Sequence, residues 1–184
     1  INDIKLILNC LNIRYLEAPA GCEGEQTASH LTNIGKADAV YSGDTDPVAY
    51  GATVLLRRNP KDKKIYEYPL DDIIKQVDEH SSIENPTIDD VRKAAVVLGT
   101  DLAEKSPGIG AKTVLKKLHT VKLTKKQKEA IAAFAEQCDE SKLLIYNADK
   151  EPFAEDCMKA ELIEWLVNVK SFNKTRITAS FEKK

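Results

Sequence analysis

Two pairs of carboxylates stand out because a single residue separates the members of each pair. The pairs are Glu23 with Glu25, and Asp44 with Asp46, and each follows a short apolar segment. In an open α/β sheet the loops at the carboxyl ends of neighbouring strands converge on one crevice, so we expect the two pairs to meet there. Asp101 ends a predicted helix, where a carboxylate is electrostatically unfavourable, which suggests that it has a role beyond solvation.

Carboxylates that share one cleft repel one another and raise each other's pKa unless a cation neutralises them. Oxygen ligands without His or Cys favour hard ions such as Mg²⁺ or Mn²⁺ over zinc. Two such ions, about 3.5 to 4 Å apart, can activate a water and stabilise a leaving oxygen in phosphoryl chemistry. In the alternative interpretation the pairs only lie on solvated loops or complement helix N-termini.

A glycine-rich turn forms a second candidate site. Gly108 and Gly110 flank Ile109, and backbone N–H groups in such a turn can approach a phosphate with no Cβ in the way. We expect Ile109 to seat the turn in the core. Eight lysines and no acidic residue lie between positions 105 and 128, a pattern that favours contact with a phosphate backbone rather than with bases. The alternative is an ordinary tight turn followed by a solvated helix face.

The composition argues against a membrane protein and against a secreted one. The chain has 184 residues and a formal net charge of −2, and no apolar run approaches the roughly 20 residues that span a bilayer. No secretory signal is visible, and the sequence begins without Met, so we expect an intracellular fragment of a longer protein, either nuclear or cytoplasmic. The four cysteines are far apart without a zinc-finger spacing, which favours free thiols over a disulfide or a zinc site.

The periodicity of apolar residues predicts the elements that must position these groups. It predicts strands over 13–16, 37–41, 52–57 and 64–68, and helices over 4–11, 23–34, 71–77, 87–98, 111–118, 124–137, 159–169 and from 173 onward. Alternating strands and helices favour a parallel or mixed sheet with flanking helices, and we expect it to be mostly parallel. We therefore predict an α/β lobe over residues 1–80 and a helical lobe over 81–184.

The order of these motifs resembles the flap endonuclease (XPG-type) branch of the structure-specific 5′ nucleases. The resemblance rests on the glutamate segment, the aspartate loop, the last aspartate, the glycine turn and the terminal helices, which here are residues 15–25, 42–51, 98–101, 108–112, 161–166 and 172–177. It extends over almost the entire chain. It implies a PIN-like (resolvase-like) α/β domain followed by a helix-hairpin-helix (H3TH) lobe.

The resemblance also implies a function. It implies a Mg²⁺-dependent endo- or exonuclease, with Mn²⁺ able to substitute, that cleaves branched DNA near single-strand/double-strand junctions such as 5′ flaps in replication and repair. The expected catalytic metal ligands, for two ions, are Glu23, Glu25, Asp44, Asp46 and Asp101. The expected DNA-binding residues at the hairpin, where a K⁺ ion also binds in the family, are Ser106, Gly108, Ile109, Gly110, Lys112, Thr113 and Lys116.

Several features depart from the family pattern. Gly24 and Gln26 stand where alanines are usual, Leu102 replaces an aromatic residue, and no sliding-clamp motif is visible. The family also supplies aspartates from an N-terminal segment, so we expect such a segment of the same protein to complete the active site and the fragment alone to be weak or inactive. A degenerate relative that binds branched DNA or RNA without cleaving it is the alternative function.

Overall fold

The computed structural model describes residues 1–155 and 157–182, and the chain divides into two compact units. The terminal unit contains Ile1–Glu17 and Ser141–Lys184, and the central unit contains Ala18–Glu140. This division does not coincide with the predicted boundary at residue 80, because helices on both sides of that residue pack together within the central unit. Among the described residues, no helix is long and apolar enough to cross a membrane.

The sheet of the central unit has the order β2-β3-β4, formed by Val40–Tyr41, Val54–Arg58 and Ile65–Pro69. Strand β2 is parallel to β3, with Val40 opposite Leu55, whereas β3 and β4 form the antiparallel hairpin predicted from the turn between them. The sheet is therefore mixed. The expectation of a mostly parallel sheet is wrong for the described residues, which contain one parallel and two antiparallel strand pairs.

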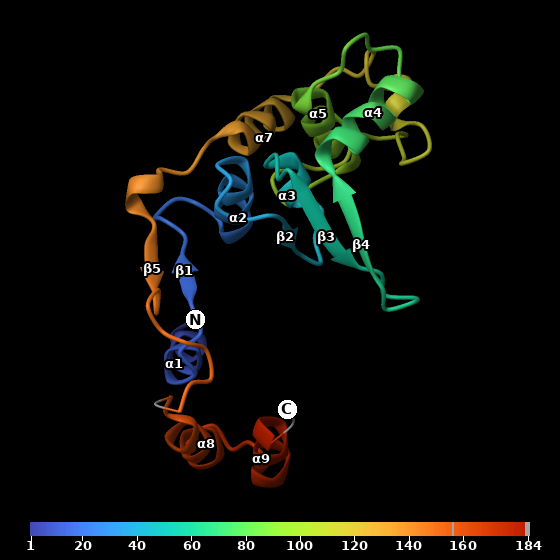
Figure 1. Cartoon of the computed structure of the whole chain (residues 1–184). Coiled ribbons are helices and arrows are strands. Elements are labelled where there is room, and N and C mark those ends of the chain that lie inside the picture. Colours follow the sequence, from blue (N-terminus) through green and yellow to red (C-terminus); the bar gives the residue numbers. More distant parts are fainter. Residues whose placement is uncertain (156, 183–184) are drawn as a thin grey trace. The chain divides into compact units, whose positions relative to one another are not determined.

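The described part of the central unit also contains six helices: α2 (Gly24–Asn33), α3 (Asp46–Ala49), α4 (Leu70–His80), α5 (Ile88–Leu98), α6 (Val114–Lys117) and α7 (Lys125–Ala135) (Figure 1). Most lie close to their predicted bounds. Helix α6 is much shorter than the predicted segment 111–118, because the Thr113 hydroxyl hydrogen-bonds to the backbone N–H and C=O of Gly110 and holds a turn there.

Helix α5 is the centre of this unit. Val96 and Val97 are both fully buried, and each belongs to a different hydrophobic cluster. The Val96 cluster includes Tyr50 and Phe134, whose rings meet edge to face at 4.9 Å between centroids. One helix therefore joins the segment after the aspartate pair to α7 and, on its other side, to α4 and α6.

The terminal unit contains α1 (Asn2–Cys10), β1 (Tyr15–Glu17), β5 (Leu144–Tyr146), α8 (Lys159–Asn168) and α9 (Lys174–Glu182). Strand β1 pairs with β5 in an antiparallel ribbon, on which Tyr15 and Tyr146 stack at 4.7 Å. We did not predict β5 from the sequence; it is a three-residue strand within the short apolar run 143–146. A second core forms around Leu162 and Leu166, together with Cys10 and Leu11.

A buried glutamine holds the segment that leads into the glycine turn. Gln127 is 2% exposed, and its Nε2 donates to Val96 O, Glu104 O and Ser106 Oγ at 3.0–3.2 Å. Its Oε1 accepts from Thr124 N at 3.1 Å and so caps the first turn of α7. One side chain therefore ties α5, α7 and the turn together.

We predict that Gln127→Ala lowers the free energy of unfolding by about 2–4 kcal/mol, because it leaves buried acceptors unpaired and opens a cavity. Urea denaturation of the two proteins measures the difference. The matched control is Gln76→Ala, since the Gln76 side chain is exposed on α4. Equal midpoints for Gln127→Ala and the unmodified chain would contradict this role.

Candidate metal centre and glycine hairpin

Packing of α2 against α3, rather than a shared sheet edge, brings the two acidic pairs together. The expectation that β1 and β2 are neighbouring strands is wrong, because β1 pairs with β5 in a separate sheet. Glu23 is the N-cap of α2, and α3 begins at Asp46. Ser29 Oγ on α2 donates to Pro47 O at 3.3 Å, which joins the two helices directly. Thr53 N also donates to Thr32 Oγ1 at 3.1 Å.

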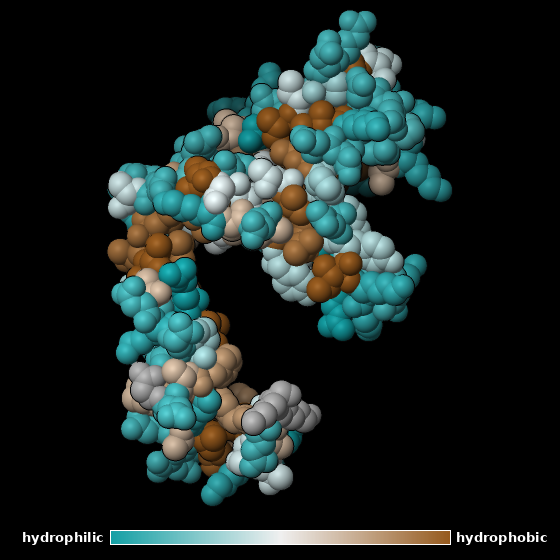
Figure 2. Space-filling model, viewed as in Figure 1, coloured by the Kyte–Doolittle hydropathy of each residue, from teal (hydrophilic) through white to brown (hydrophobic). Residues whose placement is uncertain are grey.

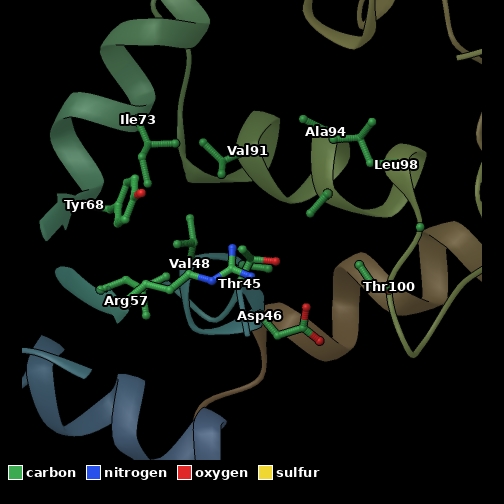
Figure 3. A pocket seen from close by; sticks show the side chains of 14 residues that line it. Thr45, Asp46, Val48, Arg57, Tyr68, Ile73, Val91, Ala94, Leu98 and Thr100 are labelled. Atoms are coloured by element: carbon green, nitrogen blue, oxygen red, sulfur yellow. The ribbon is translucent and has the colours of Figure 1, made fainter. Parts of the chain in front are cut away.

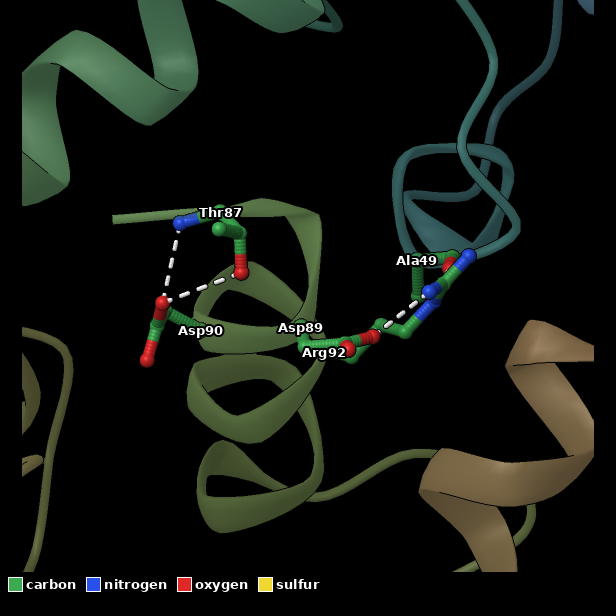
Figure 4. Close-up of polar contacts among 5 residues, drawn as sticks. All are labelled: Ala49, Thr87, Asp89, Asp90 and Arg92. Carbon is green, nitrogen blue, oxygen red and sulfur yellow. Dashed lines mark hydrogen bonds and ion pairs between the residues drawn. The ribbon is translucent and has the colours of Figure 1, made fainter. Parts of the chain in front are cut away.

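Helix α5 fixes the short helix that begins with Asp46. Arg92 Nε donates to Ala49 O, the last carbonyl of α3, at 2.9 Å, and Arg92 Nη1 pairs with Asp89 at 2.7 Å (Figure 4). Asp90 accepts from the backbone N–H and the hydroxyl of Thr87, which begins α5 as predicted (Figure 4). The Asp46 backbone is therefore held by a well-anchored helix.

Four of the five predicted carboxylates act electrostatically on the fifth, Asp46. Partial burial and, to a smaller extent, the charges of Asp44, Asp101, Glu25 and Glu23, in that order of importance, together raise the pKa of Asp46 from 3.8 to about 6. Coulombic effects of this kind require proximity. The structure thus brings together side chains that are distant in the sequence, and Asp46 and Glu25 are the half-buried members among them.

The donor set fits a hard divalent cation in its chemistry. All five groups are carboxylates, and a cation would remove the repulsion that raises the Asp46 pKa. Their spacing is looser than a closed coordination shell, since within residues 1–155 and 157–182 no three His, Cys, Asp or Glu side chains lie close enough to hold an ion. The five carboxylates therefore form a loose acidic cluster around Asp46.

Two hydroxyl groups hold the glutamate pair. Tyr50 Oη donates to Glu23 Oε2 at 3.1 Å, and Ser42 Oγ donates to Glu25 Oε1. Burial and the hydrogen bond to Glu23 raise the pKa of Tyr50 above its ordinary value, so its hydroxyl stays protonated. Sequence reasoning missed these contacts, because nothing in the spacing of Ser42 or Tyr50 indicates a partner in another segment.

An apolar cavity of about 380 Å³ adjoins the carboxylates. Ile73 and Val91 project into it from α4 and α5, opposite Val48, and Asp46 lies at its edge (Figure 3). Thr45, Arg57 and Thr100 add polar groups to the wall. The mainly apolar lining suits packing of another apolar segment better than binding of a phosphate.

The glycine turn has the geometry expected from the sequence. Ser106 N donates to Val97 O at 2.9 Å, and Ile109 packs on the cluster around Val97, as predicted. Gly99, with a φ of +99°, begins this connection, and a Cβ there would lie 3.1 Å from the Cβ of Lys105. Position 108 also favours glycine, because its φ of +70° lies in the left-handed region.

The predicted contact residues of the hairpin are accessible. Lys112, Thr113 and Lys116 are exposed, and Gly108 and Gly110 have open space where a Cβ would be. Beside the hairpin lies a groove of about 800 Å³ lined by Lys105, Lys117, Lys122, Lys125 and Lys126. The hairpin therefore presents backbone and cationic groups on the same surface.

The β3–β4 hairpin carries a further basic patch that sequence reasoning missed. Its turn is covered by hydrophilic side chains (Figure 2). Five exposed cations surround it: Arg57, Arg58, Lys61, Lys63 and Lys64. Tyr66 and Tyr68 on β4 are 41% and 44% exposed. The signal was present in the sequence, because residues 57–64 contain five cations and a single acidic residue, Asp62.

Known proteins resemble this chain in sequence. The XPG I-region family matches residues 12–101. Flap endonuclease 1 of Methanococcus aeolicus is 29% identical, in a match that covers the whole chain and 54% of that relative. Flap endonuclease 1 of Nanoarchaeum equitans is 31% identical over 62% of the chain and 35% of the relative. The chain thus spans about half the length, or less, of these relatives.

Solved structures resemble the fold. Flap endonuclease-1 from Methanococcus jannaschii has a TM-score of 0.74 and 24% identity, over 96% of this chain and 54% of that one. Human GEN1 in complex with Holliday junction DNA has a TM-score of 0.63 and 20% identity, over 96% and 49%. The α/β arrangement of small sheets and helices is therefore that of these nuclease cores. The family match and the sequence match over the whole chain place the chain in the flap endonuclease/XPG family.

Proposed function

We propose that this chain is part of a Mg²⁺-dependent, structure-specific 5′ nuclease that hydrolyses phosphodiester bonds at single-strand/double-strand DNA junctions such as 5′ flaps. The observation that carries the proposal is the cluster of five carboxylates around Asp46, which lies in the same compact unit as a lysine-flanked glycine hairpin. The similarity to flap endonuclease 1 over the whole chain supports it. In this interpretation the central unit contributes a PIN-like sheet and an H3TH motif.

The metal ligands in this proposal are Glu23, Glu25, Asp44, Asp46 and Asp101. Bound Mg²⁺ or Mn²⁺ would supply Lewis-acid stabilisation of the phosphate and a water of lowered pKa. The residues of this chain would hold the negatively charged carboxylate oxygens close together, where they can bind the ions. The α2–α3 contact fixes the two pairs, and the Gly99 turn redirects the chain just before Asp101. Two ions balance the charge of five carboxylates better than one.

In this proposal the glycine hairpin binds duplex DNA. Backbone N–H groups near Gly108 and Gly110 approach a phosphate, and Lys112 and Lys116 add charge that does not depend on sequence. Backbone carbonyls of the same turn would supply oxygen ligands for K⁺. The basic β3–β4 turn offers a second surface for DNA, since exposed tyrosines among cations suit nucleic acid.

An upstream segment of the same protein completes the active site in this proposal. Two observations support it: the relatives are about twice as long as the matched region, and the apolar cavity beside Asp46 is open. We expect the 184-residue chain to cleave 5′-flap DNA weakly or not at all, and the full-length protein to cleave it with Mg²⁺. A full-length protein that cleaves no branched DNA with either Mg²⁺ or Mn²⁺ refutes the nuclease function.

A protein that binds branched DNA or RNA without cleaving it is the second candidate. The loose spacing of the carboxylates favours it, because no described trio encloses an ion. One assay, of DNA binding and cleavage, distinguishes the two functions. Tight, salt-dependent binding in EDTA without cleavage in Mg²⁺ supports the binding protein, and cleavage supports the enzyme.

We predict that replacing Lys112 and Lys116 together with alanine weakens binding of a DNA duplex by about tenfold at 100 mM salt. If each lysine contacts a phosphate, the slope of log K against log salt becomes less steep by about 2. Fluorescence anisotropy in EDTA measures the slope without cleavage. The charge-matched control replaces Lys75 and Lys174, which are exposed on α4 and α9. An equal change of slope in the two double variants would contradict specific contact by the hairpin.

A further inference from the structure

Two hydroxyl groups cross-link the two acidic pairs. Ser42 precedes Asp44 by two residues, and Tyr50 follows Asp46 by four. The hydroxyls of both residues donate to the glutamate pair: Ser42 to Glu25, and Tyr50 to Glu23. Each glutamate therefore has one oxygen bound by the segment that carries the aspartates.

The Tyr50 hydroxyl is fixed by its surroundings. The residue is 8% exposed, its ring packs edge to face on Phe134, and Phe134 is 1% exposed. Its backbone N–H donates to Asp46 O at 3.0 Å, within the turn that ends α3. The ring has no room to rotate far without disturbing the core, so the hydroxyl has a defined position.

Ser42 links three groups at once. Its hydroxyl donates to Glu25 and accepts from Asp44 N at 3.0 Å. A hydroxyl can donate one hydrogen bond and accept others, so the two contacts are compatible. The position of the Glu25 carboxylate is therefore coupled to the backbone of the aspartate loop.

We infer that Tyr50 and Ser42 are positioning residues that hold Glu23 and Glu25 ready for a divalent cation and thereby set the affinity of the site for it. The inference rests on the proposed metal-dependent function. A carboxylate that accepts one hydroxyl hydrogen bond keeps its remaining lone pairs for a metal. Partners that orient metal ligands in this way typically contribute 10–100-fold in metal affinity. These two hydrogen bonds are needed because the carboxylates repel one another and would otherwise move apart.

The test uses the full-length protein and removes single hydroxyls. We expect Tyr50→Phe and Ser42→Ala each to weaken Mn²⁺ binding by about tenfold in calorimetry without DNA. The Mg²⁺ concentration that gives half-maximal cleavage should rise by a similar factor. Ser42→Thr, which keeps the hydroxyl, should restore most of the affinity. The melting temperature of Tyr50→Phe in EDTA should remain within about 2 °C, because the ring and its packing on Phe134 are kept.

Tyr66→Phe is the matched control. Tyr66 Oη donates to Asp62 at 2.6 Å on the exposed β3–β4 hairpin, so the change removes the same kind of hydrogen bond elsewhere. Mn²⁺ affinity should not change in this variant. Unchanged affinity in Tyr50→Phe and Ser42→Ala, or a fall in melting temperature without loss of affinity, overturns the inference. An unmodified protein that binds no Mn²⁺ and cleaves nothing overturns the proposed function instead.

Discussion

Replacing Asp46 with asparagine lowers the rate of flap cleavage by the full-length protein by about a thousandfold or more. The expected size corresponds to about 4 kcal/mol of transition-state stabilisation. Asp46 is half-buried, and the charges of all four other carboxylates raise its pKa. An amide there loses the negative charge that attracts a cation, while its size and shape stay almost the same.

Single-turnover cleavage of a labelled 5′-flap substrate at saturating Mg²⁺ measures this effect. The control is Asp38→Asn, because Asp38 is an exposed carboxylate that does not contribute to the Asp46 pKa shift. The control should cleave at the normal rate. If Asp46→Asn retained more than a tenth of the activity, the carboxylate cluster would not be the catalytic centre.

The same substitution stabilises the metal-free protein. The folded-state pKa of Asp46 is raised from 3.8 to about 6, so its ionisation is less favourable in the folded chain than in the unfolded one. In EDTA the unmodified protein therefore loses stability as the pH rises from about 4 to 6, and it stays less stable above that range. Asp46→Asn avoids this loss, and we expect its free energy of unfolding at pH 8 to be about 1 kcal/mol higher, because solvent screens part of the repulsion at a partly exposed carboxylate.

Urea denaturation in EDTA at pH 4 and pH 8 measures the difference, which should be present at pH 8 and small at pH 4. Added Mg²⁺ should stabilise the unmodified protein more than the variant, because binding to the folded state raises its stability. Equal stability of the two proteins in EDTA at pH 8 would show that the carboxylates do not repel one another strongly. Stability gained at the expense of activity is typical of a functional site.

The sequence predicted the members of the cluster but not the way in which they meet. The spacing of Glu23 with Glu25 and of Asp44 with Asp46 identified Asp46 and three of the four carboxylates whose charges raise its pKa. The expected cause, two neighbouring parallel strands, was wrong because β1 pairs with β5. That pairing joins residues more than 120 positions apart, and the three-residue strand β5 has no periodicity by which it could be predicted.

The elements with strong local signals were predicted well. The Thr87 cap, the start of α7 after Thr124 and the β3–β4 hairpin follow from residues close together in the chain. Features that depend on tertiary contacts were missed. The hydrogen bonds of Gln127, Tyr50 and Ser42 join segments between 17 and 31 residues apart, so their partners are defined only by the folded structure.

The position of bound metal tests the central claim most directly. Crystals of the full-length protein soaked in Mn²⁺ should show an anomalous peak with oxygen ligands about 2.0–2.3 Å away from Asp46 and at least two of Glu23, Glu25, Asp44 and Asp101. Such a peak would mean that the loosely spaced carboxylates converge on an ion. A Mn²⁺ peak remote from all five side chains, in a protein that still cleaves flap DNA, would contradict the account.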